Sequence, residues 1–271
     1  MLIPRILTAI VLIALIVPAL LYLSPHQLVF AIAGVMLVAA WEWGGFFPNS
    51  NLQIRLGFVA LVAAAFACVF FVTGFDVTLP ALLWLAMAWW TAAFVWLMLR
   101  PDLVPRWSIV LATIAVCVPA WAALSALQLH TNQGPQWLLF LILLVASADI
   151  GAYFAGRMFG KTKLAPQVSP GKTWEGVAGG TLLSGAVAFA GSKWFGYEPL
   201  QFTVLGVVAV WVSVIGDLTE SLFKRHVGLK DSGRILPGHG GVMDRIDSLT
   251  AGAPVFVLGL YFLGGLSFSS T

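Results

Sequence analysis

Residues 202–248 place a long apolar run directly before the most charged stretch of the chain. The run begins FTVLGVVAVWVSVIG and continues as DLTESLFKRHVGLKDSGRILPGHGGVMDRIDS, which covers Asp217 to Ser248. The chain has 14 Lys and Arg and 11 Asp and Glu residues, and ten of these 25 lie in that second part. An apolar segment of about 20 residues can cross the hydrocarbon core of a membrane. We therefore expect a membrane helix that leads into a polar, functional segment.

The composition of the whole chain is that of an integral membrane protein. Of its 271 residues, 60% are hydrophobic and only 9% are charged, and the mean hydropathy is +0.96. A soluble domain carries about 25% charged residues. Inside a membrane the backbone must be hydrogen-bonded within the protein, and long apolar runs satisfy this requirement as helices. We therefore expect an all-α fold, a polytopic membrane helix bundle without a soluble domain.

About nine apolar runs have the length of a membrane span, which is about 20 residues. We divide the chain into residues 1–135, with N-terminal transmembrane helices, and residues 136–271, with the catalytic transmembrane helices and their cytoplasmic loops. The first run is interpreted as a retained span rather than a cleaved leader. The expected spans are roughly 5–23, 27–47, 56–74, 79–99, 107–127, 136–157, 174–195, 202–224 and 249–267.

Proline positions support these boundaries, because proline breaks the interior of a helix. Pro18 and Pro119 fall inside expected spans, where we expect them to bend the helix. The prolines expected between spans are Pro25, Pro48, Pro80, Pro101, Pro105, Pro135 and Pro199.

The basic residues predict the orientation of the bundle. Twelve of the fourteen Lys and Arg lie in or beside the loops after spans two, four, six and eight, and only Arg5 and Lys193 lie elsewhere. Basic loops stay in the cytoplasm, so we expect an inner (plasma) membrane protein with a cytoplasmic site and both termini outside. Cysteines at Ser232 and Ser269 should then label from opposite sides. A basic face suits anionic headgroups, although topology alone also explains the bias.

Carboxylates in the charged stretch are spaced for metal binding. On a helix Asp217, Ser221 and Lys224 share one face, since they lie at i, i+4 and i+7. Asp244 and Asp247 are three residues apart, so they also point the same way. Paired oxygen ligands suit a hard cation such as Mg²⁺. The alternative is a solvated, charged loop between two membrane helices.

Glycines surround the histidine of the same stretch. Gly238, Gly240 and Gly241 flank His239, and glycine permits positive φ angles and close approach of a ligand to the backbone. These positions therefore predict a tight loop that can contact a substrate.

The expected span at 136–157 contains an acidic residue. Asp149 lies eight residues before Arg157, about 12 Å deeper along the helix, and a carboxylate inside a membrane marks a functional site by default. Tyr153 shares its face, and Gly151 and Ala155 permit close helix packing. The alternative is a structural Asp paired with a lysine or with backbone.

The next loop reads SPGKTWEG, from Ser169 to Gly176, and leads into the span at 174–195. Lys172 and Thr173 stand before a helix N-terminus, which can hold phosphate through charge, hydroxyl and free N–H groups. A simple helix cap is the alternative, and the spacing is not that of a P-loop. Glu42, near the cytoplasmic end of the span at 27–47, either joins the site or satisfies a helix neighbour, and we favour the neighbour.

The charged stretch resembles a known family. The pattern S-x-x-K-R-x4-K-D-x-G-x3-P-G-H-G-G-x-x-D-R-x-D runs without a gap from Ser221 to Asp247. It is similar to the signature of the phosphatidate cytidylyltransferase family, also called CDP-diacylglycerol synthases, and SPGKTWEG resembles a second block of that family. The resemblance implies that CTP and phosphatidate give CDP-diacylglycerol and pyrophosphate in phospholipid biosynthesis. It implies one or two divalent cations, Mg²⁺, allows a monovalent cation, and implies a homodimer among membrane lipids with no nucleic-acid partner.

Both reactants of this reaction are anions, so catalysis needs positioning and charge neutralisation more than a covalent nucleophile. His239 is accordingly expected to organise its loop or bind phosphate rather than act as a base. The expected catalytic residues are Asp217, Lys224, Asp244 and Asp247, with Asp217, Asp244 and Asp247 as metal ligands. The expected substrate-binding residues are Asp149, Tyr153, Ser169, Lys172, Thr173, Glu175, Ser221, Arg225, Lys230, Asp231, His239, Gly240 and Arg245.

Two other classes of protein are alternatives to this interpretation. A CDP-alcohol-type membrane phosphotransferase also uses closely spaced aspartates, but its D-G-x2-A-R-x8-G-x3-D-x3-D pattern is absent from this sequence. An anion- or proton-coupled transporter would use Asp149 and Asp217 as a pathway. The sequence has no evident internal repeat, which such transporters commonly show.

Overall fold

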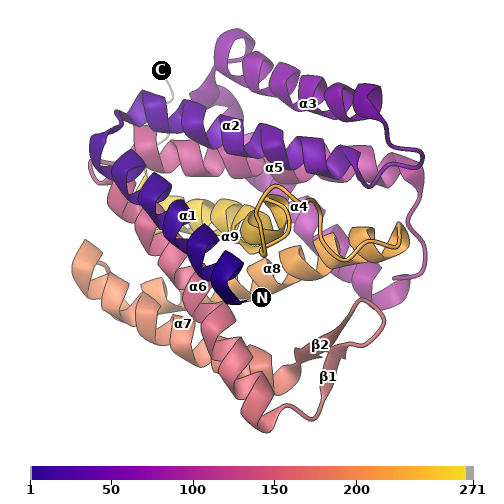
Figure 1. Cartoon of the computed structure of the whole chain (residues 1–271). Helices are drawn as coiled ribbons and strands as arrows, with labels where there is room; N and C mark the ends of the chain where they lie inside the picture. Colours follow the sequence, from indigo (N-terminus) through magenta and orange to yellow (C-terminus); the bar gives the residue numbers. More distant parts are fainter. Residues whose placement is uncertain (1, 267–271) are drawn as a thin grey trace.

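The computed structural model describes residues 2–266, with the side chains described from residue 7 onward. This part of the chain forms nine α-helices, one short π-helical turn and one two-stranded hairpin (Figure 1). The elements are α1 Leu2–Tyr22, α2 Pro25–Gly44, α3 Leu52–Ala67, its π-helical continuation η1 Cys68–Val72, α4 Phe75–Leu99, α5 Arg106–Leu129, α6 Gly134–Phe159, β1 Lys163–Ala165, β2 Ser169–Thr173, α7 Trp174–Phe195, α8 Pro199–His226 and α9 Met243–Phe262.

Each expected span overlaps one of the nine helices. Within the described residues, six segments are long and apolar enough to cross a membrane: α2, α3 with η1, α4, α5, α6 and α8. The described part of α1, Leu7–Tyr22, is a shorter apolar helix, and α7 and α9 do not meet the same criteria of length and composition. The membrane character of the chain is confirmed, and the count of nine spans stays a prediction.

Two details of the predicted helices are corrected. The fold is nearly all-α rather than all-α, because β1 and β2 form an antiparallel hairpin in which Lys163 faces Thr173. Pro80 was expected between spans, but it lies inside α4. A proline this close to a helix start removes only one helical hydrogen bond. Pro18 and Pro119 lie inside α1 and α5 as expected.

The helices pack as neighbours in sequence and across the two halves of the chain. The pairs α6–α7 and α8–α9 lie along each other, and α5 packs against α2, α4 and α9 (Figure 1). The helix α5 is buried along most of its length. Because α2, α4 and α5 all contact α8 or α9, the two parts of the chain do not pack as separate units. The division at residue 135 into N-terminal and catalytic helices stays a prediction.

Aromatic contacts show that successive helices run in alternating directions. Near the ends of α2 and α4, Trp43 and Trp96 lie edge-on against Phe223 near the end of α8, with ring centroids 4.9 and 5.6 Å apart. At the opposite end, Trp137 near the start of α6 stacks on Phe195 at the end of α7, with centroids 3.6 Å apart. We call the end that carries the hairpin and the α8–α9 loop the charged end.

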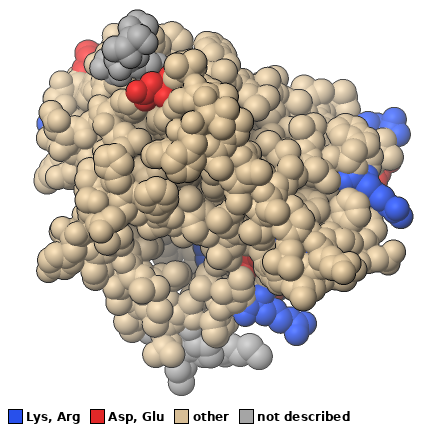
Figure 2. Space-filling model, turned by 90° about the horizontal axis from the view of Figure 1, so that it is seen from above, with Lys and Arg blue, Asp and Glu red and all other residues tan. Residues whose placement is uncertain are grey.

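The first helix begins at the charged end. The hydroxyl of Thr8 donates a hydrogen bond of 2.7 Å to the carbonyl oxygen of Pro237 in the α8–α9 loop. The expectation of both termini outside is therefore wrong on its own premise: α1 starts beside the basic loops, which that expectation placed in the cytoplasm, and nine spans would put the two termini on opposite sides. Arg5 belongs to this end of α1, so Lys193 alone among Lys and Arg of the described residues lies toward the other end. In Figure 2 uncharged residues cover nearly the whole face, and Lys and Arg stand at its margin.

Candidate functional site

A close approach of α8 and α9 brings acidic residues of the two helices together. A Cβ atom at Gly216 would lie only 2.8 Å from the carbonyl oxygen of Asp247, so only glycine permits this contact. Asp217 follows Gly216 on α8, and Asp247 interacts electrostatically with both Asp217 and Glu220. The side chains of Asp247 and Glu220 are both buried. Such a pair needs a proton or a cation between its members, because two bare carboxylates repel each other.

We call Asp217, Glu220 and Asp247 the acidic cluster. Lys224, one turn further along α8 than Glu220, neutralises part of its charge. Its Nζ lies 2.6 Å from Glu220 Oε2 and 2.6 Å from Asp244 Oδ1, and all three side chains are buried. Removal of one member of a buried ion pair leaves an uncompensated charge, which costs about 3–5 kcal/mol. Lys224 therefore stabilises the packing of α8 against α9.

Asp244 holds the loop that precedes α9. Its Oδ2 accepts hydrogen bonds from the backbone N–H of Ser232 at 2.8 Å, the hydroxyl of Ser232 at 3.0 Å and the backbone N–H of Gly241 at 2.7 Å. The residue lies in the first turn of α9, before the expected span at 249–267. Burial raises the pKa of this carboxyl, but the hydrogen bonds from Lys224, Gly241 and Ser232 outweigh burial and hold the pKa below its usual range.

Asp217 connects α8 to the hairpin. Its Oδ2 lies 2.6 Å from Nζ of Lys172 on β2, and its Oδ1 accepts a hydrogen bond of 3.4 Å from the hydroxyl of Ser221. The expected shared face of Asp217 and Ser221 is thus confirmed. The ammonium of Lys224, expected on the same face, contacts Glu220 and Asp244 instead.

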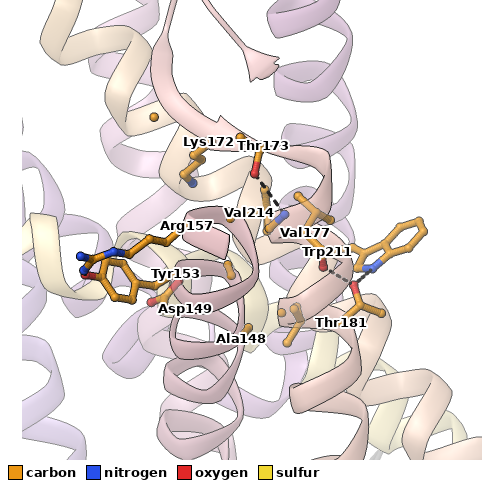
Figure 3. A pocket seen from close by; sticks show the side chains of 16 residues that line it. Ala148, Asp149, Tyr153, Arg157, Lys172, Thr173, Val177, Thr181, Trp211 and Val214 are labelled. Carbon is orange, nitrogen blue, oxygen red and sulfur yellow. Dashed lines mark hydrogen bonds between the residues drawn. The ribbon is translucent and has the colours of Figure 1, made fainter. Parts of the chain in front are cut away.

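A cavity of about 570 Å³ lies between α6, α7, α8 and β2, and we call it the α6–α8 cavity (Figure 3). One side is polar: Arg157 donates a hydrogen bond of 2.8 Å to the hydroxyl of Tyr153, and Asp149 and Lys172 lie nearby. The other side is mostly apolar. It is lined by Val177, Val210, Trp211 and Val214, with Thr181 accepting a hydrogen bond from the indole of Trp211.

Glycines allow α6 and α7 to form the walls of this cavity. A Cβ at Gly151 would lie 2.5 Å from the carbonyl oxygen of Gly179, and one at Gly180 would lie 2.7 Å from that of Ala148. The two backbones are thus in direct contact, as the small residues of α6 predicted. Thr173 caps α7 by accepting a hydrogen bond of 3.1 Å from the N–H of Gly176, which fixes the position of β2 beside the cavity.

A second cavity, of about 580 Å³, lies within the α8–α9 loop, and we call it the loop cavity. The turn that forms it is closed by a hydrogen bond of 2.9 Å from the N–H of Leu236 to the carbonyl of Gly240. Gly238 and Gly240 have φ angles of 76° and 85°, which favour glycine. The lining residues are Lys230, Asp231, Gly233, Arg234, Leu236, Pro237, Gly238, His239, Gly240 and Arg245.

The two cavities share one electrostatic environment. Asp149 of the α6–α8 cavity interacts with Lys172 and Asp217, and also with Arg245, which lines the loop cavity. Lys224 joins Asp244 of α9 to Glu220 of α8 by buried ion pairs at the same end of the bundle. The arrangement therefore places an amphipathic cavity beside a cationic one.

The expected site residues separate into those that line a cavity and those that support one. Asp149, Tyr153, Lys172 and Thr173 line the α6–α8 cavity. Lys230, Asp231, His239, Gly240 and Arg245 line the loop cavity.

Four expected substrate-binding residues line neither cavity. One of them is Ser221, whose hydroxyl donates to Asp217. Glu175 accepts the N–H of Thr162 at 3.1 and 3.2 Å and so anchors the hairpin. Arg225 donates to the carbonyl of Leu229 within the loop, and Ser169 pairs with Ala165 in the hairpin. Contacts of these four with a substrate stay a prediction.

Sequence reasoning missed the roles of Glu220 and Arg157 and set aside Glu42. The spacing of Glu220 and Lys224, i and i+4, is a local signal for an ion pair. Arg157 follows Tyr153 by the same spacing. Glu42 carries the general signal of a carboxylate inside an apolar helix.

The donor chemistry at the α8–α9 contact suits a hard divalent cation, although Asp244 is occupied. Asp217 and Asp247 offer carboxylate oxygens, and Oε1 of Glu220 is buried without a hydrogen-bond partner, as expected for oxygen ligands of Mg²⁺. Asp244 is fully engaged by Lys224, Ser232 and Gly241. Across residues 2–266, no three His, Cys, Asp or Glu side chains are grouped closely enough to hold a metal ion. The three-aspartate metal site therefore stays a prediction.

The fold and the two cavities define a polytopic membrane protein with two cavities that contain basic side chains at one end of its helix bundle. The Cytidylyltransferase family model matches residues 3–263. The chain therefore belongs to the cytidylyltransferase family, as the pattern from Ser221 to Asp247 predicted.

Curated relatives agree with this assignment. A phosphatidate cytidylyltransferase from Haemophilus influenzae is 40% identical over 284 aligned residues, which cover 96% of this chain and 98% of that protein. One from Pseudomonas aeruginosa is 40% identical over 273 aligned residues, which cover 96% of this chain and 97% of that protein. One from Brucella suis is 45% identical over 159 aligned residues, which cover 54% of this chain and 55% of that protein.

Proposed function

We propose that the protein transfers the cytidylyl group of CTP to phosphatidate, which gives CDP-diacylglycerol and pyrophosphate. The observation that carries this proposal is the amphipathic α6–α8 cavity beside the cationic loop cavity. A lipid that ends in phosphate needs the first kind of site, and a nucleoside triphosphate needs the second. Relatives that match nearly the whole chain carry the name of this activity.

Phosphatidate is assigned to the α6–α8 cavity. Its phosphate would lie near the cations of Arg157 and Lys172, and its glycerol and acyl chains would lie along Val210, Trp211 and Val214. Arginine suits a phosphate because its planar guanidinium makes two parallel hydrogen bonds. The exposed fraction of Trp211 is 57%, so this side of the cavity is accessible to a lipid from the bilayer.

CTP is assigned to the loop cavity. Lys230, Arg234 and Arg245 line it and can neutralise the triphosphate. With the lipid in the neighbouring cavity, the lipid phosphate and the α-phosphorus of CTP would meet near Arg245 and Asp217.

The reaction is an in-line substitution at phosphorus. A phosphate oxygen of phosphatidate forms a bond to the α-phosphorus of CTP while the bond from that phosphorus to the bridging oxygen of pyrophosphate breaks. Pyrophosphate leaves with the electron pair of that bond. The attacking phosphate is already largely ionised at neutral pH, so the protein needs no strong general base. Its residues orient the two anions and neutralise their charge, which is the main requirement of phosphoryl-type transfer.

One or two Mg²⁺ ions belong to this proposal. Asp217 and Asp247 would hold the metal, with Glu220 beside them, and Asp244 would join them only if Lys224 released it. The bound cation would supply charge neutralisation for the phosphate oxygens. A monovalent cation would suit the same carboxylates.

The setting of the reaction is proposed on the basis of charge. Lys and Arg concentrate at the charged end, which supports a cytoplasmic site in the inner membrane. Nine spans would then place the N-terminus inside and the C-terminus outside. A homodimer is proposed from the family resemblance.

Turnover by the purified protein tests the proposed function. Labelled CTP is incubated with phosphatidate in mixed micelles with and without Mg²⁺, and labelled lipid and released pyrophosphate are measured. Equal amounts of both products, only with phosphatidate and Mg²⁺ present, are expected. A CDP-alcohol-type phosphotransferase would instead consume labelled CDP-diacylglycerol with an alcohol and release CMP. Uptake of an anion into vesicles without chemical change would indicate the transporter class and overturn the proposal.

A further inference from the structure

Glu42 of α2 reaches across the bundle to the start of α9. Its Oε1 accepts a hydrogen bond of 3.0 Å from the N–H of Val242, and its Oε2 accepts one of 2.7 Å from the N–H of Met243. Oε2 also accepts a hydrogen bond of 2.9 Å from the hydroxyl of Ser232. The exposed fraction of Glu42 is 1%, so these donors replace the water that a carboxylate would otherwise require.

The backbone of the α8–α9 loop is shaped around this carboxylate. A Cβ at Gly233 would overlap Oε1 of Glu42, and a Cβ at Gly241 would lie 2.5 Å from both carboxylate oxygens. Both glycines have ordinary negative φ angles, so the requirement at these positions is space rather than backbone conformation. Gly233 and Gly241, at two separate positions of the loop, therefore pack directly against Glu42, which precedes them by almost two hundred residues.

The contacts of Glu42 extend to residues that line the loop cavity. The hydroxyl of Ser232, which donates to Glu42, also lies within hydrogen-bond distance of Asp244 Oδ2 at 3.0 Å. Arg245, which lines the loop cavity, follows Asp244 in the first turn of α9. The α6–α8 cavity is lined by none of these residues.

We propose that Glu42 is a positioning residue of the loop cavity. It replaces a side-chain cap at the start of α9, where Val242 provides none, and it fixes the first turn from which Arg245 extends. A carboxylate near a helix N-terminus also interacts favourably with the helix dipole. The N-terminal half of the chain thereby contributes to a site whose other residues lie after residue 216. The kinetic consequence rests on the proposed function, whereas the structural consequence does not.

Glu42→Gln tests the proposal, because glutamine keeps the size of the side chain but replaces one acceptor oxygen by a donor NH₂ group. Trypsin cleavage after the exposed residues Lys230 and Arg234 reports on the order of the loop without reference to activity. We expect cleavage about tenfold faster than in the wild type, since the loop loses a hydrogen bond to a charged group. In turnover assays we expect KM for CTP to rise about tenfold and KM for phosphatidate to stay unchanged.

Asp76→Asn is the matched control, because it makes the same chemical change in the ion pair with His130 at the opposite end of the bundle. It should alter neither loop cleavage nor KM for CTP. If Glu42→Gln does not fold, Ser232→Ala serves as the second variant, because it removes one of the three hydrogen bonds to Glu42. It should also speed loop cleavage and raise KM for CTP, but by smaller factors. Wild-type cleavage in the folded variants, or equal effects of the control, would overturn the proposal. If the Glu42→Gln variant is cleaved faster but the wild-type protein shows no measurable turnover, the positioning role is retained and the proposed function is refuted.

Discussion

Lys172 is the residue that connects the proposed lipid site to the acidic cluster. Its ammonium lies 2.6 Å from Asp217, and the exposed fractions of the two side chains are 27% and 28%. A partly exposed pair of this kind contributes little to stability. Lys172 also lines the α6–α8 cavity, where the proposed function gives its ammonium a role toward the lipid phosphate.

Lys172→Ala is therefore expected to weaken substrate binding while the protein still inserts and purifies normally. KM for phosphatidate should rise about tenfold, which corresponds to about 1.4 kcal/mol of lost phosphate contact, and KM for CTP should change less. Steady-state kinetics in mixed micelles measure both constants. Lys193→Ala, at the other end of the bundle, serves as the control. Unchanged kinetics over the full range of both substrates would remove Lys172 from the site.

Asp247 provides the sharper test of metal binding. In the Asp247→Asn variant the side chain keeps its size, but the acidic cluster loses a charge. If the residue holds Mg²⁺, the rate should fall by orders of magnitude, because the cation supplies several kcal/mol of charge stabilisation. Turnover is measured over a Mg²⁺ titration beside thermal melting. Near-normal turnover at ordinary Mg²⁺ in the folded variant would exclude Asp247 as a ligand.

Asp244→Asn should behave differently from Asp247→Asn. Asp244 is an ion-pair partner of buried Lys224, so its loss should lower the free energy of unfolding by about 3–5 kcal/mol. Thermal melting in the same detergent measures this change. A melting temperature equal to that of the wild type, together with a large loss of rate, would instead support Asp244 as a metal ligand.

Single residues differ in how far the sequence could predict their roles. Asp217 and Ser221 are one turn apart on α8, so their contact could be predicted from the spacing alone. Lys172 could be predicted because it stands just before a helix start. The partners of Glu42 lie 190 to 201 positions away, and no local pattern specifies such a pairing. Its role required the packing of α2 against the α8–α9 loop.

At the scale of the helix, α6 and α7 are in direct backbone contact, and both contribute residues to the wall of the α6–α8 cavity. Gly151→Ala would place a methyl group 2.5 Å from the carbonyl oxygen of Gly179, and a backbone atom cannot move away without shifting the helix. Overpacking of this kind costs about 1–3 kcal/mol. We therefore expect a lower melting temperature and a raised KM for phosphatidate, measured on the purified variant.

Gly57→Ala is the matched control for this substitution. Gly57 lies in the interior of α3 with no atom within 4 Å of a Cβ placed there. Alanine favours a helix over glycine by about 1 kcal/mol, so this variant should melt at the same or a higher temperature. Equal stability of the two variants would show that α6 and α7 can separate freely.

Helices were easier to predict than the short hairpin between α6 and α7. A membrane span needs about 20 apolar residues, and runs of that length are visible in the sequence. The hairpin has strands of three and five residues, which are too short for an alternating pattern. Their pairing depends on contacts made elsewhere, such as the hydrogen bonds from the N–H of Thr162 to Glu175.

For the whole molecule, the concentration of charge at one end could be predicted from the loops, but the side of the N-terminus was predicted wrongly. The charge bias assigned the even loops correctly to one end of the bundle. The direction of α1 follows from a single long-range contact, the hydrogen bond from Thr8 to Pro237. The alternation of helix ends then puts the α1–α2 turn at Ser24 at the opposite end from the hairpin.

The orientation of the whole bundle can be measured with single cysteines in a variant that lacks Cys68 and Cys117. Ser269 lies outside the described residues, and Ser232 is buried with an exposed fraction of 3%, so exposed positions are better probes. Lys161 lies just before the hairpin at the charged end. Ser24 lies in the α1–α2 turn, and Lys193 lies in the last turn of α7, both at the opposite end.

Ser24→Cys and Lys193→Cys should react with a membrane-impermeant maleimide in intact spheroplasts, whereas Lys161→Cys should react only after permeabilisation. The physical reason is that the basic residues at the charged end stay in the cytoplasm, and α1 begins at that end. Labelling of denatured protein provides the control for the reactivity of each thiol. Protection of Ser24→Cys until permeabilisation would mean that α1 starts outside, which the contact between Thr8 and Pro237 does not allow. Labelling of all three cysteines from the same side would refute the alternating bundle itself.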